Sequence, residues 1–201
     1  MTNVQVPFTS PREHQIHELA NFIVYENYKH HSQTKREYNF EKSVDEILQE
    51  EKKFFKDSKI FTVRDKSNQI VGCIRTLNWN YYDELPMQKI FGFNPILIPK
   101  VATSNQVIHI GRFAVSKNAK DKNLFKKLML HAIKQICDHK LNIGLAECDS
   151  KLLRIMNLLG IKAKRIGNPK MYLGSETIPI TIEYIGVIDF YHKNKHLITA
   201  N

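Results

Sequence analysis

The sequence predicts an α+β fold: one central mixed, mostly antiparallel sheet of six or seven strands, flanked by helices. Two observations carry this prediction. Helical patterns open the chain and an apolar hairpin follows, which gives antiparallel strands. Later, a long amphipathic helix joins two apolar strands, which is the order of a βαβ unit. We expect the 201 residues to form a single domain, 1–201, with its core at about 10–190.

Two helices are predicted at the start of the chain. Ser10 is a good capping residue, Pro11 suits the first helical position, and Glu13 can complete a capping box. Apolar residues at helical spacing continue this first helix over 10–28. A second helix is predicted over 43–55, where a serine is again followed three residues later by glutamate.

Strands and a long excursion follow. Segments 60–64 and 69–76 alternate around a polar turn and predict a hairpin. Residues 78–105 contain three prolines among aromatic residues and are expected to be irregular. An excursion of this length is long for a compact domain, which favours a functional role.

The second half alternates strands and helices. A strand is predicted at 106–115, a helix from about Asn123 to Lys140, and a short buried strand at 143–148. A short helix is predicted at 150–159, where Gly160 stops it. The last clear strand pattern is at 178–187.

The charge of the chain is uneven. Residues 101–201 hold 16 Lys and Arg against 7 Asp and Glu, and so carry +9 of the net charge of +10. A basic half predicts an anionic partner, such as cofactor phosphates, an acidic carrier protein, nucleic acid or a membrane surface. A solvated lysine face is the alternative. The overall composition, 42% hydrophobic and 25% charged, is ordinary for a globular protein.

Several classes of protein are not expected. The N-terminus lacks the basic and apolar regions of a secretory signal, and no apolar run approaches the ~18 residues of a membrane span. The three cysteines have no CxxC spacing, so reduced thiols in the cytoplasm are expected. His192 and His196 have the helical spacing of metal ligands but stand alone in a polar tail, and no metal is expected.

The strand at 106–115 carries the most informative chemistry. His109 and Arg112 interrupt an otherwise apolar strand, and buried ionisable groups are costly unless they are paired or used. The polar, lysine-rich loop at 116–123 then leads into a helix N-terminus, whose backbone N–H groups suit a phosphate. This strand therefore predicts both a donor-binding loop and a reaction centre.

These elements resemble the GNAT acyltransferase superfamily, and within it the acyl-homoserine-lactone (autoinducer) synthases and the N-acyl amino acid synthases. The segment VGCIRTL at 71–77 is similar to the glycine-then-RLL strand of the autoinducer synthases, with Arg75 at its arginine. The segment HIGRFAV at 109–115 is similar to their E-x-x-R-F-x-V strand, with Arg112 at the arginine and His109 at the position of the glutamate. The superfamily resemblance covers roughly residues 10–190.

The resemblance implies an N-acyltransferase that moves an acyl group from a thioester to an amine acceptor, such as an amino acid or its derivative. The donor would be acyl-CoA or the acyl phosphopantetheine of an acyl carrier protein, without a metal. The fold would include a splay between the strands at 106–115 and 143–148. A non-catalytic GNAT-fold protein that binds an acyl carrier or a ligand is the alternative; a nucleic-acid-binding module is a third possibility, which no zinc-finger, RRM or KH motif supports.

Four residues are candidates for the reaction centre. His109 can act as the general base, or can be a core histidine bonded to a carbonyl. Arg112 cannot lose its charge and must meet a carboxylate, a ligand or carbonyls. A bulge near Gly111 would let both reach one site. Glu147 is an alternative base or the counter-ion of Arg112, and Arg75 belongs either to the acceptor pocket or to a structural ion pair.

The donor is expected along the end of the same strand. The backbone of Phe113, Ala114 and Val115 would lie against the pantetheine arm. Ser150 occupies the position where many relatives place an asparagine that touches the donor, or else caps the short helix. The remaining donor-binding candidates, with two more lysines that would steer an acidic carrier, are Lys117, Lys120, Lys122, Asn123, Leu124, Lys126 and Lys127.

The sequence also departs from the family pattern. The loop KDKNLF at 120–125 lacks the glycine of the superfamily's pyrophosphate loop, which argues against tight coenzyme A binding and leaves open a carrier-protein donor with one phosphodiester. Met156 stands where many acetyltransferases have a tyrosine acid, and no acidic pair is recognised after the first helix. Cys148 is expected to be a small apolar filler rather than a nucleophile. Five aromatic residues of the excursion would wall an acyl tunnel or cover the sheet edge: Trp79, Tyr81, Tyr82, Phe91 and Phe93.

Overall fold

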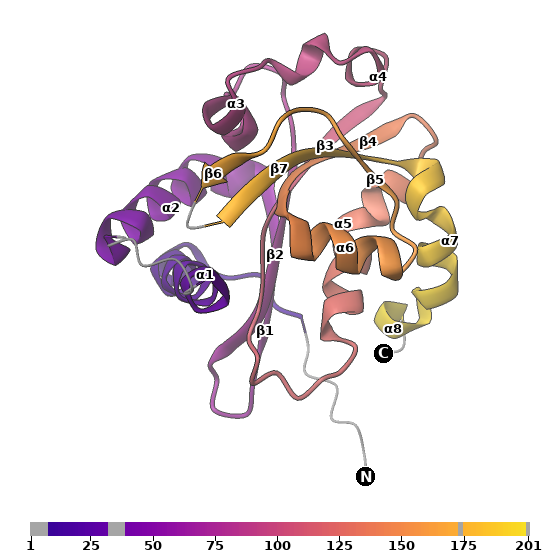
Figure 1. Ribbon diagram of the computed structural model, residues 1–201. Helices are drawn as coiled ribbons and strands as arrows, with labels where there is room; N and C mark the ends of the chain where they lie inside the picture. Colours follow the sequence, from indigo (N-terminus) through magenta and orange to yellow (C-terminus); the bar gives the residue numbers. More distant parts are fainter. Residues whose placement is uncertain (1–7, 32–38, 173–174, 200–201) are drawn as a thin grey trace.

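The computed structural model describes residues 8–31, 39–172 and 175–199, and they form helices on both faces of one sheet (Figure 1). The helices are α1 Ile16–His31, α2 Phe40–Phe54, α3 Pro86–Phe91, α4 Pro99–Ala102, α5 Leu124–Cys137, α6 Ser150–Leu158, α7 Tyr184–Asn194 and α8 His196–Thr199, with short 3-10 turns at Glu13–Gln15, Phe55–Asp57 and Pro95–Leu97. The strands are β1 Ser58–Arg64, β2 Ile70–Asn78, β3 Gln106–Val115, β4 Asn142–Asp149, β5 Ala163–Arg165, β6 Lys170–Tyr172 and β7 Ser175–Glu183.

The seven-stranded sheet has the order β1-β2-β3-β4-β7-β5, and β6 also pairs with β7. Every pair is antiparallel except β3 with β4, which α5 connects as a parallel crossover. This arrangement confirms the predicted α+β fold with a mixed, mostly antiparallel sheet. The predicted strand at 106–115 is β3, which lies centrally as expected.

Three apolar clusters hold the layers together. One joins α5, α6 and α7 to one face of the sheet, and a second joins α1 and α2 to the opposite face (Figure 1). A third lies under the excursion between β2 and β3, where Trp79, Leu85 and Met87 meet Val107 and Leu145. The sheet therefore separates two helical layers, so a residue of β3 faces one layer or the other according to its place in the pleat.

Several predicted boundaries were wrong. Ser10 does not cap the first helix; Arg12 precedes the opening 3-10 turn and its backbone N–H donates to Gln15 Oε1 at 2.9 Å. The second helix starts at Phe40 rather than at 43, because Asn39 Oδ1 accepts the N–H of Lys42 at 3.0 Å and provides the cap. The excursion is not irregular throughout: α3, the turn at Pro95–Leu97 and α4 each begin at a proline, which suits the first helical position.

The strand predicted at 178–187 was also too long. β7 ends at Glu183, and the chain continues as the helix α7. Ile185 and Val187 extend the β-branched pattern of the strand, but Val187 and Phe190 are buried as one helical face against α5. Tertiary packing therefore overrides local strand propensity.

Candidate active site

The sheet opens between its two parallel strands. β3 pairs with β4 from Gln106–Asn142 to Ile110–Ala146, after which β3 runs on to Val115 and β4 to Asp149 without further pairing between them. This confirms the predicted splay. A cavity of about 140 Å³ lies at the opening and is lined by residues of both strands.

A bulge shapes β3 at the point where the strands part. Arg75 pairs with Gly111 and Cys73 pairs with Ala114, so two residues of β3 oppose the single residue Ile74 of β2. The predicted bulge is present, but Arg112 rather than Gly111 adopts the left-handed conformation, with φ of 58°. Gly111 instead makes room, because a Cβ there would lie 3.2 Å from the ring of His109.

Two arginines and two glutamates form a buried charge cluster beside the bulge. Arg75 Nη1 donates to Glu51 Oε1 at 2.6 Å, and Arg112 Nε donates to the same oxygen at 2.7 Å. Glu50 also pairs with Arg112, and it lies 3.5 Å from Arg75. The side chains of Arg75 and Glu51 are both 0% exposed, so α2 supplies the counter-charges for two strands.

The cluster holds both carboxylate and guanidinium in their charged forms. Burial alone would raise the pKa of Glu51, but the adjacent charges of Arg75 and Arg112 lower it below its usual value. Burial would lower the pKa of Arg112, and the two glutamates raise it instead. The expectation that Glu147 is the counter-ion of Arg112 is therefore not met; Glu50 and Glu51 take that role.

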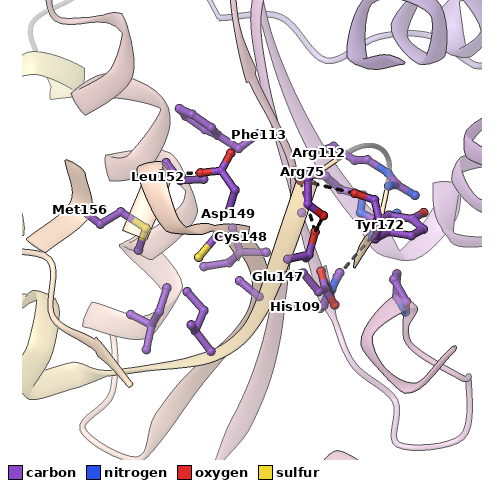
Figure 2. A pocket seen from close by; sticks show the side chains of 18 of the residues that line it. Arg75, His109, Arg112, Phe113, Glu147, Cys148, Asp149, Leu152, Met156 and Tyr172 are labelled. Atoms are coloured by element: carbon purple, nitrogen blue, oxygen red, sulfur yellow. Dashed lines mark hydrogen bonds and ion pairs between the residues drawn. The ribbon is translucent and has the colours of Figure 1, made fainter. Parts of the chain in front are cut away.

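His109 lies between Arg75 and Glu147 (Figure 2). Arg75 Nη2 lies 3.2 Å from His109 Nδ1, and an arginine can only donate, so Nδ1 is the acceptor. His109 Nε2 therefore carries the proton and donates to Glu147, whose two oxygens lie at 3.0 and 3.1 Å. The arrangement orients the ring of His109 and occupies both of its nitrogens.

Glu147 presents a carboxylate to the cavity. Its side chain is 10% exposed, whereas that of His109 is 1% exposed, and both residues line the cavity. Burial would raise the pKa of Glu147, but the bond with His109 and the charges of Arg112 and Arg75 lower it. The group is therefore ionised at neutral pH and can bind or accept a proton from an amine.

Tyr172 of β6 adds a phenol to this end of the cavity. Burial raises the pKa of the phenol, and the nearby charge of Arg112 partly offsets this rise. A second, more open hollow between α2 and α3 shares Pro86, Ile90 and Tyr172 with the internal cavity. The outer hollow and the cavity that holds His109 and Glu147 are therefore neighbours on the two sides of these three side chains.

The predicted donor residues fall into two groups. Phe113 lines the cavity and packs edge-on against Phe125, while Ala114 is buried against the layer of α1 and α2. The side chains of Lys117, Lys120 and Lys122 are exposed in the loop that leads to α5. Of the predicted strand residues, the structure therefore brings Phe113 into the cavity lining, and the lysines lie on the surface.

The start of α5 is already bonded internally. Asp121 Oδ1 accepts the N–H of Asn123 at 2.8 Å, and the Asp121 carbonyl accepts that of Leu124 at 3.0 Å. The side chain of Leu124 is buried. Two N–H groups that the sequence assigns to a donor phosphate are therefore taken, and a carboxylate lies beside them.

Ser150 is exposed as the first residue of α6 and does not cap it. Asp149 is the cap, because its Oδ1 accepts the N–H of Leu152 at 2.6 Å (Figure 2). The alternative role for Ser150 as a cap was therefore wrong.

The aromatic residues of the excursion do not line the cavity. Trp79 is buried in the third apolar cluster, Phe91 and Phe93 pack against it, and Tyr82 is exposed. Neither expectation is met, because Trp79, Phe91 and Phe93 pack over the central strands β2, β3 and β4 rather than over an edge of the sheet. Cys148 does line the cavity, but burial raises the pKa of its thiol to about 12, so it remains neutral.

Sequence reasoning missed Glu50, Glu51 and Tyr172. One pattern pointed to Glu51: it lies on the buried stripe of α2 with Val44, Ile47 and Phe54. A charged residue within an apolar stripe needs a partner, and Arg75 and Arg112 needed counter-ions. Tyr172 carried no comparable pattern, because β6 has only three residues.

The described residues contain no cluster of three or more His, Cys, Asp or Glu side chains suited to a metal ion. Among the same residues, no helix is long and apolar enough to cross a membrane.

Comparison with known proteins gives a fold but no close sequence relative. No family model matches the chain, and no curated protein matches it in sequence. Among solved structures, FeeM, an N-acyl amino acid synthase from uncultured soil microbes, matches with a TM-score of 0.61 at 14% identity, over 90% of this chain and 91% of that chain.

Two further structures extend the likeness. The CoA-dependent acyl-homoserine lactone synthase BjaI, solved with SAM and isopentyl-CoA, has a TM-score of 0.55 at 12% identity, over 94% of this chain and 89% of that chain. An acetyltransferase of the GNAT family from Staphylococcus aureus Mu50 has a TM-score of 0.57 at 11% identity, over 90% of this chain and 99% of that chain. The chain therefore has the fold of GNAT acetyltransferases and autoinducer synthases, as its sequence motifs indicated.

Proposed function

We propose that this protein is an N-acyltransferase that moves an acyl group from a thioester to an amine. The observation that carries the proposal is the opening between β3 and β4, where a bulged backbone lies beside a buried His–Glu pair. The fold is shared with enzymes named for acyl transfer, which supports this class of reaction. The arrangement supplies a place for the thioester and a proton acceptor next to it.

The reaction joins the amine nitrogen to the thioester carbonyl carbon and breaks the carbon–sulfur bond. The nitrogen loses a proton to Glu147, and the departing thiolate takes up a proton to become a thiol. His109 Nε2 donates a hydrogen bond to the Glu147 carboxylate and orients it. Arg75 donates to Nδ1 of His109 and so keeps the histidine proton on Nε2. We therefore assign Glu147 as the general base and His109 as a positioning residue, since both nitrogens of His109 are engaged.

The bulge supplies the second requirement of acyl transfer, which is stabilisation of the developing oxyanion. β4 no longer pairs with β3 beyond Ile110, so backbone N–H groups of β3 that face β4 are open to a ligand. Arg112 and its carboxylate partners hold the bulge in place. The carbonyl oxygen of the thioester would be bound by these N–H groups.

The donor lies along the end of β3 in this proposal. The backbone of Phe113, Ala114 and Val115 binds the pantetheine arm, and the lysine-rich loop at 116–123 receives its phosphate end, near Ser150. The donor is acyl-CoA or an acyl carrier protein. The bonds of Asp121 to the start of α5 leave fewer N–H groups for a pyrophosphate, and this favours the carrier protein.

The amine acceptor enters from the hollow between α2 and α3, past Tyr172. This route reaches Glu147 from the face that carries the charge cluster. Arg75 is fully buried and bonded to Glu51 and His109, so it acts on the acceptor through those groups.

The test is an assay of the purified protein with acyl-CoA, acyl-pantetheine and acyl carrier protein, and with pooled amino acids as acceptors. Mass spectrometry detects N-acyl products, and a thiol reagent detects release of the carrier thiol. Lipid extracts from cells that express the protein, compared with an Arg112→Ala variant, would identify the natural product.

Replacing Glu147 should separate chemistry from binding. Glu147→Gln removes the proton acceptor while keeping the shape, and should lower turnover by about 10²-fold with donor affinity unchanged. Glu176→Gln, at an exposed position of β7, is the matched control. Donor binding without any product would overturn the proposal in favour of the ligand-binding alternative, and binding to duplex DNA alone would favour a nucleic-acid module.

A further inference from the structure

The lining of the internal cavity is polar and charged at one end and mostly apolar at the other. On the side of α1 and α2 it is lined by Arg75, His109 and Glu147; on the other side of the sheet it is lined by apolar residues of α5, α6, β4 and β7. Figure 2 shows Met156 and Cys148 on the opposite side of the strands from His109 and Tyr172. The opening between β3 and β4 joins the two ends.

The apolar end is closed. Its lining includes Ile133, Met156, Ile180 and Ile182, each at most 2% exposed. Cys148 has a neutral thiol, and the carboxylate of Asp149, which also lines this side, is bonded to the N–H of Leu152 at the start of α6. An apolar, closed compartment next to a polar reaction centre suits the hydrocarbon tail of a thioester rather than its phosphate end.

The size of the cavity limits the tail. A cavity of about 150 Å³ with an apolar lining holds a ligand such as benzene, which has six carbons. The cavity here is about 140 Å³, and part of it surrounds His109 and Glu147, where the thioester carbonyl would lie. Little space remains beyond a short chain.

We propose that the donor acyl group is short, about four to six carbons, and that Met156 at the closed end limits its length. This inference rests on the proposed acyl transfer. Within the cavity each added methylene strengthens binding by about fourfold. A longer chain must displace packed side chains of α5 and α6, and binding then falls by roughly tenfold or more.

The experiment measures binding of S-acyl-pantetheines with saturated chains of increasing length by calorimetry. These probes lack the nucleotide and its phosphates, so the lysine-rich loop does not decide the outcome. For the unaltered protein, affinity should rise to a maximum at about six carbons and then fall. Affinity that keeps rising with longer chains, or does not depend on chain length, would overturn the inference.

Two variants test whether side chains in the cavity lining limit the length of the acyl chain. Met156→Ala removes the Cγ, Sδ and Cε atoms and should move the maximum to chains longer by about two or three carbons. Ala146→Val narrows the cavity and should move it to shorter chains. Leu153→Ala is the matched control, because Leu153 is buried on the same helix as Met156 but does not line the cavity. A shift of the same size in the Leu153→Ala control would refute the role of Met156.

The result also separates this inference from the proposed function. A maximum in binding at short chains without any N-acyl product would support the short acyl compartment and refute acyl transfer. Turnover that is fastest with long chains would support acyl transfer and refute the short compartment. Failure of every S-acyl-pantetheine to bind would overturn the inference itself.

Discussion

Glu51 offers the sharpest test of the buried charge cluster. Its Oε1 atom accepts hydrogen bonds from both Arg75 and Arg112, and its side chain is 0% exposed. Glu51→Gln keeps the shape of the side chain but leaves two buried guanidinium groups facing Glu50 alone. Removal of one partner from a buried ion pair costs about 3–5 kcal/mol. For a chain of this size, the midpoint of thermal unfolding should fall by roughly 6–20 °C.

The assay is thermal unfolding followed by circular dichroism at pH 7, with a surface ion pair as the control. Glu18 forms a two-pronged pair with Arg64, at 2.7 Å for each bond, but its side chain is 43% exposed. Glu18→Gln should therefore cost only about 0.2–1 kcal/mol. The reasoning fails if Glu51→Gln lowers the midpoint no more than Glu18→Gln does.

The effect should also depend on pH. The folded-state pKa of Glu51 lies below its usual value, so its charge stabilises the fold above the unfolded-state pKa of about 4.3. That contribution is lost as the pH falls through the folded-state pKa. The difference in unfolding free energy between the protein and Glu51→Gln should thus shrink below about pH 4. A difference that stays constant from neutral to strongly acidic pH would contradict the assignment.

Two further predictions concern the donor. Asp121→Ala removes a carboxylate from the start of α5 and frees the N–H of Asn123, so the KM for acyl-CoA should fall about two- to fivefold. The KM for acyl-pantetheine, which lacks the nucleotide phosphates, should stay unchanged; equal shifts for both donors would count against a phosphate site there. Charge reversal at Lys122 and Lys126 should weaken binding of an acidic acyl carrier protein and flatten its salt dependence, as measured at low and high ionic strength. Steering by these lysines is excluded if both quantities stay the same.

The sequence predicted the sheet well where one pattern dominated. The strand at 106–115 matches β3 at both ends, because its residues are mostly apolar and β-branched and polar segments border them. The resemblance to autoinducer synthases also anticipated the splay and the bulge. The start of α2 was predicted wrongly at Ser43, because Asn39 can also cap a helix and only its hydrogen bond with the N–H of Lys42 distinguishes the two positions.

The candidate site was harder to predict because its partners are distant in the chain. Arg75 and Arg112 were recognised as residues in need of counter-ions, but Glu50 and Glu51 lie in a highly charged helix that resembles a solvated surface. These two carboxylates meet Arg75 and Arg112 only because α2 packs on β2 and β3. The tautomer of His109 likewise depends on Arg75 on one side and Glu147 on the other, and no local pattern encodes it.

The left-handed backbone of Arg112 has a mechanical consequence. A side chain in this conformation costs about 1–2 kcal/mol, and its restraint comes from another layer of the molecule, through the carboxylates of α2. If α2 moved away from the sheet, the bulge would lose its anchor and β3 would relax towards a flat strand. The backbone N–H groups at the opening would then turn away from the proposed thioester site. The packing of α2 on the sheet therefore controls the backbone conformation of the bulge in β3, although β3 lies more than fifty residues further along the chain.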